Sequence, residues 1–334
     1  MEVWILFNEE IEASSSEAFE IRRFLAEGRD MGIDVKVFKP EQFDLLVCND
    51  DKQSVLIDGQ LMPLPDFVLP RTYVIDTGYF ALAVIRQLER LGVKVFNGSQ
   101  AIETVSDKLH THQALIEGGL PTPRTMLGKF PIDLDLVENY IGFPVVVKTL
   151  LGVNGTGVFL MDDKKTFHEM MSLLAETNPN LQIIFQKFIA KSKGVDIRLF
   201  VVDGKVVASM ERRAKDGDFK ANFSQGGSVL EFKPDPLAKD LAVMTAGILD
   251  LQVAGIDLLY AEDGYTICEA NSFPGFKGLE SCCDVNIPRE IFKAMQKRLD
   301  AGSSFREVSL PSIQKRIEEN FDEHMEEEFY THSS

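Results

Sequence analysis

Three side chains with oxygen donors lie near one another in the last third of the sequence. They are Asp257, Glu269 and Asn271, and each falls in a segment typical of a strand. Glu269 and Asn271 are two residues apart, so in a strand their side chains share one face. Carboxylate and amide oxygens suit a hard cation such as Mg²⁺ or Mn²⁺, which ATP phosphates can also coordinate. The pattern predicts a metal site, with a solvated polar strand face as the alternative.

The turn between the two strand segments decides whether these side chains meet. A three-residue loop at 262–264 pairs Asp257 with Glu269, whereas a two-residue turn at 263–264 shifts the register by one and moves Asp257 to the opposite face. Two carboxylates held side by side repel each other unless a cation lies between them, so their pairing would indicate a metal ion. The metal hypothesis therefore requires the three-residue loop, which brings the two carboxylates together. In the same register Cys268 turns towards the core.

A glycine-rich segment follows a lysine earlier in the chain. Lys148 comes after an apolar run at 143–147, and the glycine-rich residues 152–157 lead into a second apolar run at 158–161. Backbone N–H groups in such a loop can surround phosphate oxygens, and a lysine at the end of the incoming strand adds a fixed positive charge. A hairpin with a structural glycine loop fits the same residues. The segment therefore indicates phosphate binding only together with other motifs.

Two further segments suit a nucleotide and an anionic substrate. An apolar strand at 181–185 runs into residues 186–189, where backbone groups could pair with the edge of an adenine while apolar side chains cover the ring, although a plain connector fits as well. A basic cluster at 211–215 stands out in this acidic chain. Clustered arginines suit an anionic substrate or an acyl phosphate, and a solvated charged loop is the alternative.

The elements that must position these residues begin with an α/β layer in the first hundred residues. Short apolar runs predict strands at 3–7, 35–38, 66–69 and 93–96, and residues 79–91 have helical spacing. No GxGxxG motif follows the first strand and no GxxxxGK[ST] motif occurs in the chain. Rossmann and P-loop phosphate sites therefore have no support.

A further helix is predicted to carry Lys108 and two histidines. Ser106 is its expected N-cap, and two glycines at 118–119 end it. His110 and His112 are two residues apart on this helix, so they point in different directions and cannot chelate one metal ion. We interpret both as surface histidines.

Composition narrows the class of protein. The 334 residues are 45% hydrophobic, enough for two or three packed domains, and the first residues lack a signal-peptide pattern, so we expect a cytoplasmic protein without a membrane segment. Four cysteines without CxxC spacing indicate reduced thiols. The net charge of −17 disfavours nucleic acid as a partner. Residues 301–334 contain eight acidic and three basic residues, which we read as a solvated acidic extension.

The order of these parts resembles the ATP-grasp superfamily, and specifically the RimK-like amino-acid ligases, over about residues 1–300. Five motifs carry the resemblance: Val146-Val147-Lys148; Gly155-Thr156-Gly157; Gly194-Val195-Asp196-Ile197-Arg198; the segment from Glu211 to Phe219; and Glu269-Ala270-Asn271-Ser272-Phe273-Pro274-Gly275.

The resemblance implies an α/β protein with the α+β ATP-grasp fold, in which two lobes clasp ATP. The implied domains are an N-terminal α/β pre-ATP-grasp domain at 1–104, a central ATP-grasp lobe with the glycine-rich loop at 105–189, a C-terminal ATP-grasp lobe with the metal site at 190–300, and the acidic extension at 301–334.

The resemblance also implies roles for individual residues. Nucleotide-binding positions would be Lys108, Lys148, Gly155, Thr156, Gly157, Gln186, Lys187, Phe188, Ile189, Asp196, Lys220 and Asn222. Metal ligands for two Mg²⁺ or Mn²⁺ ions would be Asp257, Glu269 and Asn271. Arg212 would be catalytic by steadying the transferring phosphoryl group, and substrate carboxylates would contact Arg71, Arg198 and Arg213. The chain departs from the family at Lys187, where relatives commonly carry Glu.

The implied activity is an ATP-dependent carboxylate–amine ligase that forms an amide bond through an acyl phosphate. The expected partners are an amino acid, with glutamate favoured, and a carboxylate-bearing acceptor such as a protein C-terminus, a peptide or a small molecule. A homo-oligomer is compatible with this reading. Peptide macrocyclisation is an alternative reaction of the same fold, and a nucleotide-binding regulator without catalysis is an alternative from a different class.

Overall fold

Parallel strands form the N-terminal sheet, and the side chains of its two inner strands are buried on both faces. In the computed structural model, which describes residues 1–48, 54–72, 74–150, 157–215, 219, 221 and 227–301, with the backbone alone at 74–78, the sheet has the order β2-β1-β6-β7. Its strands are β1 (Glu2–Leu6), β2 (Asp34–Phe38), β6 (Phe67–Pro70) and β7 (Lys94–Val95). Such two-sided burial explains why they read as continuous apolar runs.

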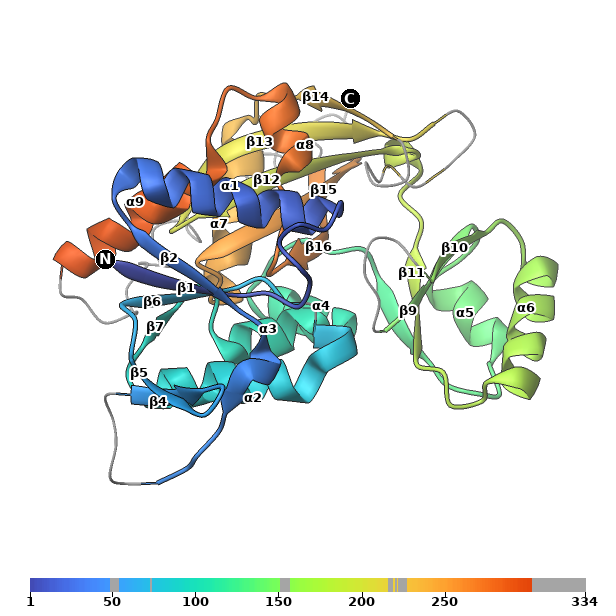
Figure 1. Cartoon of the computed structure of the whole chain (residues 1–334). Helices are drawn as coiled ribbons and strands as arrows, with labels where there is room; N and C mark the ends of the chain where they lie inside the picture. The colour runs from blue at the N-terminus through green and yellow to red at the C-terminus, as the bar shows by residue number, and fades with distance from the viewer. Residues whose placement is uncertain are drawn as a thin grey trace.

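Helices cover the two faces of this sheet (Figure 1). On β1, Val3 and Ile5 pack into a core with α1 (Ser16–Met31), whereas Trp4 and Leu6 pack into a second core with α2 (Val74–Arg90). Ser15 caps the N-terminus of α1 by accepting a hydrogen bond from the backbone N–H of Ala18. A small antiparallel sheet lies beside this layer and contains β3 (Phe43–Asp44), β4 (Ser54–Ile57) and β5 (Gln60–Pro63), with the 3₁₀ turn Pro40–Gln42 before it.

Two short helices lead into the central part of the chain. They are α3 (Ser99–Ser106) and α4 (Lys108–Glu117). The predicted N-cap at Ser106 is wrong, because Ser106 ends α3 and the side chain of Asp107 caps α4 by accepting from the backbone N–H of His110 at 3.0 Å. Asp at the N-cap supplies an acceptor for the otherwise unpaired N–H groups of the first turn.

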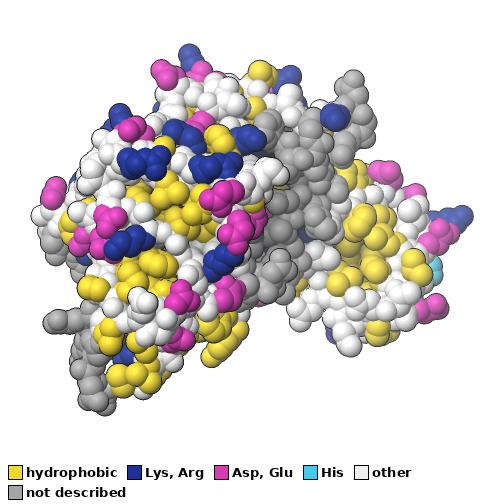
Figure 2. Space-filling view, in the orientation of Figure 1, with side chains coloured by type: hydrophobic (Ala, Val, Ile, Leu, Met, Phe, Trp, Pro, Cys, Tyr) yellow, Lys and Arg dark blue, Asp and Glu magenta, His cyan; other side chains and the backbone are white. Residues whose placement is uncertain are grey.

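The central sheet is antiparallel and packs around its own core. Its order is β10-β9-β11-β8, and α5 and α6 cover one face. The elements are β8 (Thr125–Gly128), α5 (Leu134–Tyr140), β9 (Val145–Thr149), β10 (Val158–Met161), α6 (Lys164–Thr177) and β11 (Ile183–Lys187). This lobe stands apart from the rest of the molecule (Figures 1 and 2).

The C-terminal sheet is antiparallel, with the order β14-β13-β12-β15-β16. Its elements are the 3₁₀ turn Ala190–Ser192, β12 (Val195–Val202), β13 (Lys205–Arg213), β14 (Ser228–Glu231), α7 (Pro236–Ile248), β15 (Val253–Ala261), β16 (Gly264–Asn271), α8 (Lys277–Cys282) and α9 (Ile287–Asp300). Helix α7 packs on one face, and α1, α8 and α9 share a core with the other face. The N-terminal and C-terminal sheets are therefore joined by a common core.

Outside these elements, the acidic extension beyond Ala301 lies among the residues that the structure does not describe. The domain limits at 104, 189 and 300 stay predictions. Within the described part of the chain, the model has no helix with both the length and the apolar character needed to span a membrane.

Asn97 ties the N-terminal sheet to the strands that carry the predicted metal ligands. Its fully buried side chain donates from Nδ2 to the carbonyl oxygens of Val253 and Ser272, both at 2.7 Å. Its Oδ1 accepts from the backbone N–H groups of Gln252 at 2.7 Å and Val253 at 2.9 Å. One amide thus satisfies four buried backbone groups at the start of β15 and the end of β16.

Replacing this amide should destabilise the protein strongly. We expect Asn97→Ala to lower the free energy of unfolding by at least about 3 kcal/mol, because each buried backbone group left without a partner costs about 1–3 kcal/mol. Urea unfolding followed by circular dichroism measures the change. Asn139→Ala, at an exposed position in α5, is the matched control and should stay within about 0.5 kcal/mol. Equal stability of the two variants would contradict the role of Asn97.

Candidate active site

The hairpin of β15 and β16 pairs Asp257 with Glu269, but not through the predicted loop. The turn has two residues, at 262–263, and Ala261 pairs with Gly264. A β-bulge beside Asp257 then shifts the register, so that one residue of β16 has no partner on β15. The prediction of a three-residue loop is therefore wrong, while the pairing that it was meant to produce is present.

Cys268 is the extra residue at this bulge, and its side chain does not face the core. Leu258 pairs with Ile267 and Asp257 pairs with Glu269, which leaves Cys268 between them. Its Sγ lies 3.8 Å from Nζ of Lys148. The prediction that Cys268 turns inward is wrong because a bulge interrupts the strict alternation of side chains along a strand.

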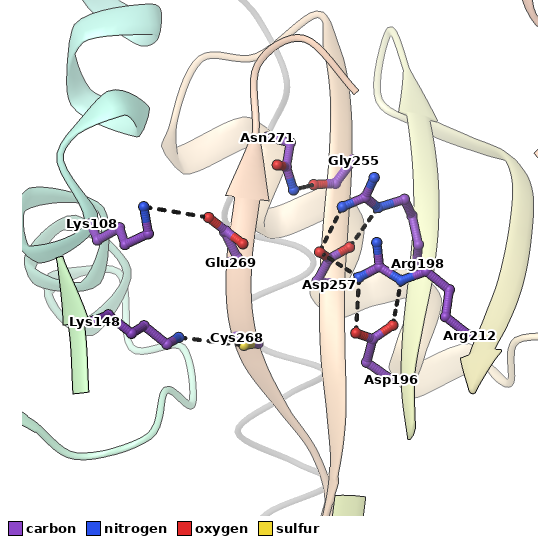
Figure 3. Close-up of polar contacts among 10 residues, drawn as sticks. All are labelled: Lys108, Lys148, Asp196, Arg198, Arg212, Gly255, Asp257, Cys268, Glu269 and Asn271. Atoms are coloured by element: carbon purple, nitrogen blue, oxygen red, sulfur yellow. Dashed lines mark hydrogen bonds and ion pairs between the residues drawn. The ribbon is translucent and has the colours of Figure 1, made fainter. Parts of the chain in front are cut away.

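Two arginines hold the Asp257 carboxylate (Figure 3). Arg198, on the neighbouring strand β12, donates from Nε to Oδ1 and from Nη2 to Oδ2, both at 2.7 Å. Arg212, on β13, donates from Nη2 to Oδ2 of Asp257 at 2.8 Å. The same Arg212 forms a two-pronged ion pair with Asp196, with Nε 2.5 Å from Oδ1 and Nη2 2.9 Å from Oδ2. Two carboxylates and two guanidinium groups thus form one charge network on this sheet.

The network keeps Asp257 ionised although it is only 4% exposed. Burial disfavours the charged carboxylate, but the guanidinium groups of Arg198 and Arg212 outweigh it and lower the pKa of Asp257 below its ordinary value. Arg198 and Arg212 therefore supply part of the positive charge that we expected a metal ion to supply. The two pairings explain why Arg198 and Arg212 are both needed beside one carboxylate.

The three predicted metal ligands remain suitable for a hard cation. Oδ1 of Asp257 accepts one hydrogen bond and keeps a second lone pair, while the half-exposed Glu269 carboxylate contacts only Lys108, at 3.9 Å, among the described residues. Asn271 donates from Nδ2 to the carbonyl of Gly255 at 3.1 Å, which leaves its amide oxygen turned away from that carbonyl (Figure 3). Within the described residues no site is built from three or more His, Cys, Asp or Glu side chains, so a metal site here would need the amide of Asn271 beside the two carboxylates.

Two lysines reach the same strand from other parts of the chain (Figure 3). Lys108 comes from α4 and contacts Glu269, and Lys148 comes from β9 of the central sheet and contacts Cys268. Burial lowers the pKa of Lys108, and the nearby Lys148 ammonium adds to the effect against the opposing attraction of Glu269. Two largely buried ammonium groups near each other favour an anion beside them, as the predicted phosphate contacts require.

The other predicted nucleotide-binding residues lie at the end of the central sheet or outside the described residues. Gln186 is buried on β11, Lys187 is exposed at its end, and Phe188 and Ile189 are half-buried just beyond it. Gly157 has a φ of 75°, and a Cβ there would lie 2.6 Å from Oγ1 of Thr149, so only glycine fits. The predicted contacts at Gly155, Thr156, Lys220 and Asn222 fall outside the described residues.

The predicted substrate arginines differ in availability. Arg71 is buried, pairs with Glu20 through Nη2 and donates from Nη1 to the carbonyl of Pro274 at 3.1 Å. These contacts occupy its guanidinium with groups of the protein itself, and its predicted role in binding a substrate carboxylate stays a prediction. Arg213 is exposed at the end of β13 and pairs with Glu211 at 2.6 Å.

One buried residue that sequence reasoning missed is His112. His110 is exposed as predicted, but His112 is only 6% exposed, and its Nε2 lies 3.0 Å from Nε2 of Gln186. The surface interpretation of His112 is therefore wrong. The sequence held one signal that His112 faces the site. His112 is four residues after Lys108, so the two side chains lie on the same face of the helix.

Comparison with known proteins shows the family of this chain. A family model described as the RimK PreATP-grasp domain matches residues 1–102, and one described as the RimK-like ATP-grasp domain matches residues 105–295. A relative from Legionella pneumophila named probable alpha-L-glutamate ligase is 35% identical over 293 residues, which cover 87% of this chain and 96% of the relative.

Solved structures show the same fold. The ATP-grasp ligase PsnB in complex with a minimal precursor aligns with a TM-score of 0.69 at 19% identity, covering 89% of this chain and 98% of that chain. The macrocyclase MdnC from Microcystis aeruginosa, bound with the precursor peptide MdnA, aligns with a TM-score of 0.65 at 14% identity, covering 88% and 99%. Together with the family matches, these likenesses confirm the predicted α+β ATP-grasp fold. The chain belongs to the RimK-like ATP-grasp family and is an ATP-dependent ligase.

Proposed function

We propose that this protein uses ATP and Mg²⁺ to join a substrate carboxylate to the amine of an amino acid, with L-glutamate as the amino acid added. The observation that carries the proposal is that Asp257 on β15 pairs with Glu269 on β16, the strand that also carries Asn271 and that Lys108 and Lys148 contact. This pairing supports a site in which oxygen ligands for a divalent cation lie near ammonium groups for phosphates, as magnesium–nucleotide binding requires.

In this mechanism the carboxylate of the acceptor attacks the γ-phosphorus of ATP, giving an acyl phosphate and ADP. The amine of glutamate then attacks the acyl carbon and releases phosphate, which leaves an amide bond. Lys108 and Lys148 bind the phosphates and neutralise part of their charge. When bound, the divalent cation held by Asp257, Glu269 and Asn271 supplies further charge neutralisation at the phosphates.

We assign to Arg212 the stabilisation of the transferring phosphoryl group. Its guanidinium is already ordered by Asp196 and Asp257, so it can stabilise developing negative charge without reorganisation. Asp196 belongs to this support in addition to its predicted role in nucleotide binding. Arg213, the exposed arginine on the same strand, is the candidate for the acceptor carboxylate, and Arg198 acts chiefly by holding Asp257.

The name of the Legionella relative supports glutamate as the added amino acid. That relative is 35% identical over 87% of this chain and 96% of its own length. The macrocyclase is only 14% identical and supports the fold alone. An acceptor with a free carboxylate, such as a protein C-terminus, a peptide or a small molecule, fits the exposed position of Arg213.

The activity can be tested directly. Incubation with ATP, Mg²⁺, glutamate and a panel of carboxylate acceptors should yield ADP together with products heavier by glutamyl residues, as read by mass spectrometry. A peptide product lighter by one water would instead identify a macrocyclase. Tight ATP binding without turnover on any acceptor would favour a regulator and contradict the proposal. Omitting glutamate is the matched control for ATP hydrolysis without transfer.

Loss of the Glu269 charge should greatly reduce turnover with little effect on folding. We expect Glu269→Gln to reduce ADP release about 100-fold at ordinary Mg²⁺, because a ligand for the cation is lost. The melting temperature should stay near that of the parent, since the carboxylate is half-exposed and has only a long contact with Lys108.

Glu262→Gln, in the exposed turn of the same hairpin, is the control and should be fully active. Asp257→Asn should lose both activity and stability, because it weakens two buried arginine pairings. Near-normal ADP release by Glu269→Gln would contradict the metal assignment.

The role of Arg213 predicts a selective defect. Arg213→Gln should raise the KM for the acceptor about tenfold, because a charge-assisted hydrogen bond to its carboxylate is lost. Affinity for ADP, measured by calorimetry, should not change. Arg29→Gln at the exposed end of α1 serves as the control for a lost surface charge. An unchanged acceptor KM in the Arg213 variant would remove Arg213 from the substrate site.

A further inference from the structure

A chain of hydrogen bonds fixes the buried amide of Gln186 at the end of the central sheet. Nε2 of Gln186 lies 2.9 Å from Oγ1 of Thr125, on the adjacent strand β8, and 3.0 Å from Nε2 of His112, on α4. Gln186 is the first residue of the segment 186–189, which we predict to receive the adenine. Thr125 and His112 have no role in the proposed reaction.

Thr125 determines which way the Gln186 amide is turned. The Thr125 hydroxyl donates its single hydrogen to the carbonyl of Pro123 at 2.9 Å. With this hydrogen used, the Thr125 oxygen accepts from Nε2 of Gln186, so the NH₂ group of Gln186 faces Thr125.

The second hydrogen of this NH₂ group determines the state of His112. It is directed at Nε2 of His112, which must therefore be unprotonated, so the ring is neutral and carries its hydrogen on Nδ1. Burial, with the nearby Lys148 and Lys108 ammonium groups, lowers the pKa of His112 to about 4, which agrees with a neutral ring at physiological pH.

This arrangement is held at a cost. Nδ1 of His112 is buried and has no hydrogen-bond partner among the described residues. A buried donor without an acceptor is unfavourable, so a purely structural histidine would gain by turning its ring or by replacement with an apolar residue. This tautomer is the one that lets Nε2 of His112 accept a hydrogen bond from Gln186.

Both hydrogens of the Gln186 amide are thus used, and its remaining polar atom is Oε1. No described residue donates a hydrogen bond to this oxygen. It is therefore an acceptor of fixed orientation beside the proposed adenine segment.

We propose that His112 and Thr125 are positioning residues that hold Oε1 of Gln186 towards the 6-position of the purine, and so make the enzyme select ATP over 6-oxo purine nucleotides. The proposal rests on the proposed use of ATP, and it takes the base to lie at the predicted adenine segment, 186–189. Adenine carries an amine at this position and donates to Oε1. Hypoxanthine and guanine carry a carbonyl oxygen there, which would face another acceptor.

Freeing the amide should remove this selectivity. Without one of its two anchors Gln186 can rotate its side-chain amide and offer NH₂ to a 6-carbonyl. Selectivity would then fall because the site binds both purines, and not because it loses its fold. This separates a positioning role from a structural one.

The test compares ADP with IDP, which differ only at the 6-position edge of the base, by isothermal calorimetry in the presence of Mg²⁺. The parent protein should bind ADP more tightly than IDP, and His112→Leu should reduce the ratio of the two affinities about tenfold. Thr125→Val removes the other anchor with little change in shape and should act in the same direction.

Three matched variants keep the anchors and should retain the parent ratio. Thr125→Ser keeps the hydroxyl, and His112→Gln keeps an acceptor near the position of Nε2. His110→Leu changes the exposed histidine on the same helix. Melting temperatures with and without ADP show which variants are folded.

The outcomes separate this inference from the function on which it rests. If the parent protein binds neither nucleotide, the proposed function fails first. If the parent prefers ADP but His112→Leu and Thr125→Val keep the same ratio, the positioning role is wrong while the function stands. An equal loss of ADP and IDP affinity in the two variants would also overturn it, because it would show only a structural role.

Discussion

The buried network of Asp257 with two arginines is the interaction on which the site depends. A carboxylate that is almost completely removed from water is unstable unless cations and hydrogen bonds compensate it. Arg198 and Arg212 provide that compensation from two neighbouring strands, and Asp196 balances the additional positive charge. The result is an ionised, oriented ligand on a rigid sheet. The electrostatics of catalysis and the stability of this sheet therefore depend on the same four side chains.

The distribution of cores explains how the parts of the site are supported. The N-terminal and C-terminal sheets share a core, and Asn97 and the Glu20–Arg71 pair connect them close to the ends of β15 and β16. The central sheet packs around a separate core. Lys148 belongs to the central sheet, whereas the oxygen ligands belong to the joined body, so phosphates bound by both would bridge two units of independent packing. Such an arrangement suits a site that must admit a nucleotide and then enclose it.

Much of the fold and part of the site could be predicted from the sequence. The runs at 3–7 and 158–161 form strands close to the expected positions, because continuous or alternating apolar residues have few other stable conformations. Glu269 and Asn271 share a face because their spacing of two is a property of any strand. Lys148 lies near the end of β9, as the apolar run before it predicted. The directions of side chains within one strand or helix are set by its backbone geometry, so they can be predicted without knowing which elements pack against it.

What only the tertiary structure decided concerns relations between elements. The bulge that pairs Asp257 with Glu269 and turns Cys268 towards Lys148 depends on the fit of two strands, and the turn residues alone do not specify it. The burial of His112 depends on the packing of α4 against the central sheet. The sequence by itself determined the kinds of groups present and their local faces. Burial, register and ion pairing were decided by the tertiary structure, because these depend on which side chains from distant segments exclude water together.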